Sequence, residues 1–172
     1  MIAVRRHDLP GAIRYFEAAT KADPLRSDSF YFWAEALRLD HRPLDAVRHY
    51  EQALERTPGE SDAQLCEFKV RVARLEAGDA AKVRDEVEAQ RTRGALSVDW
   101  LMTDAALRLH AGEIKPAAEL ITQARARGVT GLFLTCAGDT LFRNAAETHE
   151  PIRAALGTVA VPAQSPVPAP QG

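Results

Sequence analysis

The residue types that most often carry catalysis are scattered singly along this chain. No two histidines stand four residues apart beside a glutamate, as a helical zinc protease requires. Asp40 precedes His41, but neighbouring residues in a turn point apart, and no serine lies in a nucleophile elbow. The sequence has no glycine-rich phosphate loop. We therefore expect no enzyme activity, no metal and no cofactor, and no such role for His7, His41, His49, His110 or His149.

Cysteine spacing and charge exclude further classes of site. Cys66 and Cys136 stand far apart in the sequence, which suits neither a metal site nor a disulfide framework, so we expect two buried thiols. The formal net charge is −2, which provides no overall attraction to nucleic acid or an anionic membrane. One arginine-rich stretch is interleaved with acids and is expected to be a solvated helix surface: Lys82, Arg84, Arg91 and Arg93 alternate with Asp85, Glu86 and Glu88.

The aromatic run at residues 30–33 is the most suggestive local feature for binding. Four consecutive aromatic side chains cover every side of a helix, so they cannot all serve one packing surface. Tyr31, Glu35 and Arg38 share one side of such a helix, and tyrosine and arginine often anchor interfaces. Two interpretations stay open. This side contacts a partner, or Tyr31 packs on an adjacent helix while Glu35 and Arg38 form a solvated pair.

The helices that would position these residues are marked by residue types that recur along the chain at a constant interval. We call this interval, the step from Ala12 to Ala46, the repeat spacing. Small residues at the recurring positions allow close helix packing, an aromatic fills the gap between helices, and a proline ends the second helix. Ala12, Phe16, Ala19 and Pro24 return as Ala46, Tyr50, Ala53 and Pro58, and Phe30-x2-Trp33-Ala34-x2-Leu37 lies between the two sets.

This pattern and its interval resemble the tetratricopeptide repeat (TPR) family. The resemblance implies an all-α fold, a right-handed superhelical stack of antiparallel helix pairs forming an α-solenoid. We expect helices at 9–23, 27–40, 44–56, 140–149 and 151–156, with apolar stripes marking helices within 61–128. Gly78 and Gly112, one repeat spacing apart, mark turns within pairs. The expected repeats are 1–26, 27–60, 61–96 and 97–128, followed by a helical cap at 129–156 and a disordered Pro/Ala-rich tail at 157–172.

The resemblance also implies a function in protein–protein interaction. The concave surface of the array would bind a partner peptide or helix, and the protein would serve as a non-catalytic scaffold or adaptor. On that surface we expect Tyr31, Glu35 and Arg38, with Phe68 and Met102 as apolar neighbours. The carboxylate clamp that some members use is disfavoured, because the corresponding positions carry acids and apolar side chains: Asp28, Tyr31, Phe32, Glu35, Asp62, Leu65 and Cys66.

Residues 1–7 are too short for a full first helix, so the first repeat is expected to be truncated. Either the chain starts late, or Met1 lies inside a longer array, or another surface covers the bare side of the first helix. Two alternative functions follow: a regulatory or substrate-docking fragment of a larger enzyme, and a structural module that self-associates through its N-terminal side. No signal peptide or membrane span is evident, so we expect a cytoplasmic protein with no membrane or nucleic-acid partner.

Overall fold

The structure, a computed structural model, describes residues 8–157. Across this range it contains ten α-helices and no strand, which confirms the all-α prediction. Packing divides the described chain into two compact units, residues 8–77 and 78–157, each of which is described by itself. Predictions for residues 1–7, including His7, and for the tail from residue 158 lie outside the described range. Within that range no helix combines the length and the hydropathy needed to cross a bilayer.

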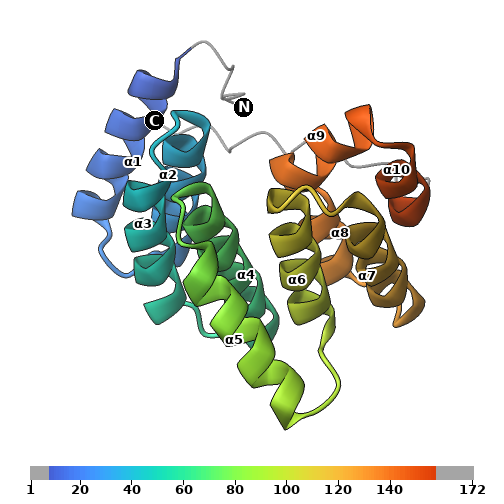
Figure 1. The fold of residues 1–172 in the computed structure, drawn as a ribbon. Helices are drawn as coiled ribbons and strands as arrows, with labels where there is room; N and C mark the ends of the chain where they lie inside the picture. Colours follow the sequence, from blue (N-terminus) through green and yellow to red (C-terminus); the bar gives the residue numbers. More distant parts are fainter. Residues whose placement is uncertain (1–7, 158–172) are drawn as a thin grey trace. The chain divides into compact units, whose positions relative to one another are not determined.

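Unit 1 is built from four helices that pack in chain order. They are α1 (Leu9–Ala22), α2 (Ser27–Leu39), α3 (Pro43–Glu55) and α4 (Glu60–Glu76). Short turns connect them, and each helix packs against the next (Figure 1). Two successive helical hairpins make α2 and α4 run in the same direction, with α3 antiparallel to both. The sequence-predicted ranges for the first three helices agree with these bounds to within a residue at either end.

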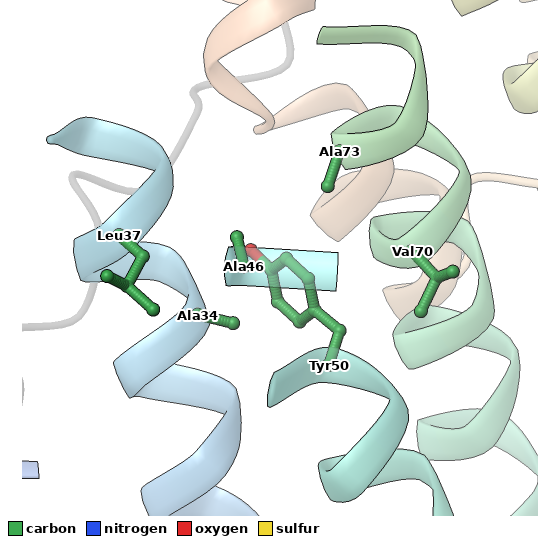
Figure 2. Packing of buried hydrophobic residues seen from close by; sticks show 6 residues of the cluster. All are labelled: Ala34, Leu37, Ala46, Tyr50, Val70 and Ala73. Atoms are coloured by element: carbon green, nitrogen blue, oxygen red, sulfur yellow. The ribbon is translucent and has the colours of Figure 1, made fainter. Parts of the chain in front are cut away.

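The core of unit 1 forms around α3. The ring of Tyr50 lies between α2 and α4 and is fully buried. Alanines at the contact positions bring the backbones close enough for one aromatic ring to fill the remaining space. Figure 2 shows this cluster, whose members are Ala34, Leu37, Ala46, Tyr50, Val70 and Ala73. The recurring small and aromatic positions of the sequence are thus core positions in α3.

A left-handed residue follows α2, α4 and α6 (Val98–His110). These residues are His41 (φ 57°), Gly78 (φ 89°) and Gly112 (φ 77°). A residue in this conformation ends a helix and lets the next N–H groups return to the last carbonyls. The N–H of Arg42 accordingly donates to the carbonyl of Leu37 at 2.9 Å. The turn after α2 therefore has the same backbone conformation as the two predicted glycine turns, although its left-handed residue is a histidine.

Arg56 fixes the start of α2 against the end of α3. Its guanidinium lies 4.5 Å from the centre of the Phe30 ring, and its Nε donates to the carbonyl of Pro24 at 2.7 Å. Its Nη1 donates to the carbonyl of Gln52 at 2.6 Å. A planar cation can make these polar bonds and a cation–π contact together, which holds the 23–26 turn in place.

Unit 2 is organised around α6. Its other helices are α5 (Ala80–Arg93), α7 (Ile114–Ala126), α8 (Gly131–Ala137), α9 (Thr140–Thr148) and α10 (Glu150–Leu156). Helix α6 packs against α5, α7, α8 and α9, and α10 packs against α7 and α9. Helices α9 and α10 lie where the sequence predicted two short helices, whereas α8 was not predicted. The side chain of Thr130 caps α8 by accepting the N–H of Phe133 at 3.2 Å.

A buried carboxylate ties α5 to α6 within unit 2. The side chain of Asp104 is fully buried and accepts a hydrogen bond from Nη2 of Arg91. Nε of Arg108 approaches its second oxygen at 3.3 Å, and Arg108 also reaches Glu113 at 2.8 Å. Both guanidinium groups remain partly exposed, so the pairing compensates the buried charge without burying two cations.

Candidate binding surface on α2 and α4

Four aromatic rings, two buried and two half-exposed, form a row that crosses α2 in unit 1. Tyr31 meets the ring of Tyr50 edge to face at a centroid distance of 5.6 Å and meets Phe32 at 5.5 Å. Phe32 in turn stacks on Phe16 of α1 at 6.0 Å. Tyr50 and Phe16 are buried, whereas Tyr31 and Phe32 keep part of their surface exposed. The row therefore has a buried base and two rings that a partner can reach.

Charged side chains continue this surface toward the C-terminal half of α2. The Tyr50 hydroxyl donates to the carboxylate of Glu35, and Nζ of Lys69 approaches the same oxygen at 2.8 Å. Arg38 lies 3.8 Å from Glu35 and binds Glu76 through two nitrogens, at 2.8 and 2.5 Å. Burial, and then the charge of Glu35, hold the pKa of Tyr50 well above its usual range, so this hydroxyl remains a donor.

The structure brings Tyr31, Glu35 and Arg38 together around Tyr50, but their exposure differs. Tyr31 and Glu35 are half-buried, whereas the Arg38 side chain is only 4% exposed and is engaged by Glu76. The interpretation in which Glu35 and Arg38 form a solvated pair is therefore wrong, because Arg38 is buried in a network with Glu35 and Glu76. Arg38 holds α2 to α4 and offers little surface to a partner.

The two apolar neighbours expected on this surface lie elsewhere. Phe68 of α4 and Met102 of α6 are both fully buried. Met102 also belongs to unit 2, so the structure does not place it beside Tyr31. No part of either side chain is accessible, and the candidate surface therefore contains neither residue.

Helix α4 contributes to this surface with residues other than the expected Phe68. Leu65 is half-buried, and Cys66 packs with Phe30 and Tyr31. Burial raises the pKa of the Cys66 thiol, a hydrogen bond with Thr57 opposes this, and the carboxylates of Asp62 and Asp28 raise the pKa further. The repeat spacing identifies which residues of α4 correspond to the surface residues of α2. It relates Asp28 to Asp62, Tyr31 to Leu65, Phe32 to Cys66 and Glu35 to Lys69.

These eight residues define what we call the α2/α4 face. Its N-terminal end carries two exposed acids, Asp28 and Asp62. Its middle carries the apolar surface of Tyr31, Phe32 and Leu65, and its far end carries the Glu35–Lys69 ion pair. Such an arrangement can bind an elongated segment, because apolar contacts and charges follow one another along one line.

A second aromatic contact in unit 1 involves a histidine. The imidazole of His49 stacks on the indole of Trp33 at 3.8 Å with an interplanar angle of 18°. Nδ1 of His49 lies 2.8 Å from Oε1 of Gln52, and Nε1 of Trp33 is buried without a hydrogen-bond partner among the described residues. Burial is the main cause that lowers the pKa of His49, and Arg48 and Arg42 act in the same direction. The folded state thus favours the neutral ring.

We expect this lowered pKa to make unit 1 less stable in mild acid. An unfolded histidine has a pKa of about 6.5, so the unfolded chain binds the proton more readily than the folded chain does. The contribution to stability is present above that pH and is lost as the pH falls through the lower pKa of the folded state. Urea unfolding at pH 7.5 and pH 5 should show a smaller acid-induced loss for His49→Gln than for the unsubstituted chain.

The matched control is His110→Gln, because His110 lies in α6 of the other unit and keeps part of its surface exposed. This variant should keep the full acid-induced loss. If the acid-induced loss of stability is the same in the unsubstituted chain and in His49→Gln, the stacked imidazole does not contribute to that loss.

Metal-binding geometry does not occur in the described part of the chain, where no three of the His, Cys, Asp and Glu side chains are grouped so that they could hold an ion.

A scan against protein-family models, a search of curated proteins and a search of solved structures each found no match to this chain.

Proposed function

We propose that this protein is a non-catalytic interaction module of the TPR type, an α-solenoid whose α2/α4 face binds a segment of a partner protein. One observation carries the proposal. Side chains related by the repeat spacing lie next to one another on two parallel helices, as in the Glu35–Lys69 contact at 2.8 Å. Repeat architectures build elongated binding surfaces in this way, with one set of contacts from each repeat.

The chemistry of the face supports binding rather than catalysis. Apart from the two acids at its N-terminal end, its charged groups are engaged within unit 1, since Glu35 accepts from Tyr50 and pairs with Lys69. Its accessible part consists of aromatic and aliphatic surface with acids at one end. Half-exposed tyrosine beside a rigid network is a common anchor of protein interfaces, because little side-chain entropy is lost when a partner binds.

Site-specific photo-crosslinking tests where a partner binds. A photoreactive phenylalanine analogue at position 32 or 65 should cross-link the same protein from an extract of the source organism. The same analogue at Leu44 or Val129, which are 74% and 56% exposed, serves as the control and should not cross-link it. Mass spectrometry of the adduct then identifies the bound segment. Cross-linking from all four positions, or from the control positions alone, would contradict the proposal.

Tyr31→Ala provides the energetic test with the segment so identified. We expect Kd to rise about tenfold or more, because a half-buried tyrosine at the centre of an interface often contributes more than about 1.4 kcal/mol. Circular dichroism must show unchanged helicity in the same variant. If helicity collapses, Tyr31 is required for the core and the assignment of the face is wrong.

Self-association through α1 is the second candidate function. It is favoured by the greater exposure of α1 residues compared with the corresponding residues of α3. Ala12 and Ala19 of α1 keep part of their surface exposed, whereas their counterparts Ala46 and Ala53 in α3 are fully buried. A second copy could cover this side of α1. Sedimentation over a hundredfold range of concentration distinguishes the candidates, because only self-association gives a concentration-dependent mass.

A further inference from the structure

The two acids at the N-terminal end of the α2/α4 face have no counter-charge. Asp28 and Asp62 are both exposed, and neither forms an ion pair within the described chain. Asp28 precedes Glu35, and Asp62 precedes Lys69, by two helical turns, so both acids lie on the side of α2 and α4 where Glu35 and Lys69 make contact. Each stands three residues before an apolar member of the face, Tyr31 or Leu65, and so lies one helical turn away from it.

Nearby cations do not neutralise this pair. The guanidinium of Arg56 is committed to Pro24, Gln52 and the Phe30 ring. The ammonium of Lys69 is only 6% exposed and belongs to Glu35 at the other end of the face. Arg26 is exposed and precedes α2, and it forms no ion pair within residues 8–157. Two like charges on one surface repel each other, and a partner cation would relieve that repulsion.

We propose that the segment bound by the α2/α4 face is basic, with an apolar side chain on Tyr31, Phe32 and Leu65 and a lysine or arginine beside Asp28 and Asp62. This inference rests on the proposed function and specifies its partner by charge. Rim charges of this kind contribute mainly to selectivity and to the rate of association, because unlike charges steer the partner and like charges repel competitors.

The two acids also have a structural interpretation. Asp28 and Asp62 lie in the first turns of α2 and α4, where a carboxylate stabilises a helix through its dipole. That role requires negative charge at both positions but no partner. It predicts a loss of stability on neutralisation and no change in binding, so stability and binding must be measured on the same variants.

A peptide array separates these interpretations. The probes are short synthetic peptides with a leucine or phenylalanine anchor, flanked at systematically varied distances by arginine, glutamine or aspartate. We expect the intact chain to bind the arginine series at least about tenfold more strongly than the aspartate series. Asp28→Asn/Asp62→Asn should reduce binding to the arginine series about tenfold, since an exposed charge pair contributes roughly threefold each. Asp28→Glu/Asp62→Glu should retain most of that binding.

The matched control is Asp85→Asn/Glu119→Gln, which removes two exposed acids from α5 and α7 of unit 2 and changes none of the eight residues of the face. It should bind the arginine series as the intact chain does. Equal weakening by both double variants would overturn the inference, as would equal binding of all three peptide series or binding of none. Suppose that all three peptide series bind equally and that Tyr31→Ala abolishes this binding. The face then remains a binding surface, and only the basic character of the partner is wrong. If Tyr31→Ala leaves binding of the arginine series unchanged, the proposed function itself fails.

Discussion

Tyr50→Ala is expected to lower the free energy of unfolding of unit 1 by about 3–5 kcal/mol, because it leaves a cavity where a fully buried aromatic ring stood. The alanines around the ring come from rigid helices on both sides, so the space cannot close by a side-chain rotation (Figure 2). Urea unfolding followed by the fluorescence of Trp33, in a Trp100→Phe background, reports on unit 1. Leu44→Ala is the control, and its change should stay within about 0.5 kcal/mol because Leu44 is exposed.

Tyr50→Phe separates the hydroxyl from the ring. It keeps the packing and removes one donor to Glu35, so we expect a loss of about 1–2 kcal/mol. The loss should be at the lower end, because Lys69 still binds the carboxylate. An alanine variant no less stable than the phenylalanine variant would show that the ring does not hold α2 and α4 to α3.

The helices of unit 1 could be predicted because short-range chemistry specifies them. Pro24 and Pro58 follow helix ends, and the small and aromatic positions between them repeat with helical spacing. Tertiary packing preserved these local preferences in α1, α2 and α3. Helix α8 was missed because so short a helix cannot display a periodic stripe, and the run Leu132–Leu134 fits a strand as well as a helix.

The misplacement of Phe68 was avoidable. One repeat spacing before Phe68 stands Ala34, which is an interior position of the motif, and one repeat spacing after it stands Met102. All three are fully buried. The same step from Tyr31 leads to Leu65, which does lie on the candidate face. The repeat spacing contained the correct assignment, but the interior and surface sides of α4 were confused.

The burial of Arg38 could not be predicted in the same way. Its partner Glu76 is distant in the sequence, and their contact depends on how α4 aligns with α2. A helical wheel describes the sides of one helix and contains no information about that alignment. Lys69 stands one repeat spacing after Glu35, but the bond from Tyr50 of α3 to Glu35 follows from no spacing within α2.

Removing both partners of Asp104 should affect unit 2 about as strongly as Tyr50→Ala affects unit 1. Arg91→Met/Arg108→Met leaves a fully buried carboxylate without compensation, and such a charge typically costs about 3–5 kcal/mol. Either single substitution should cost much less, because the remaining arginine still binds one oxygen of Asp104. Urea unfolding followed by Trp100 fluorescence, in a Trp33→Phe background, measures these changes.

Adding Asp104→Leu tests the cause. If the uncompensated charge produces the loss, the triple variant should recover much of the stability that the double variant lacks, since an apolar side chain tolerates the same burial. A triple variant less stable than the double variant would show that the uncompensated charge of Asp104 is not the cause of the loss. Because unit 2 contains Asp104 and unit 1 contains Tyr50, each set of variants also serves as the other's control for unit-specific effects.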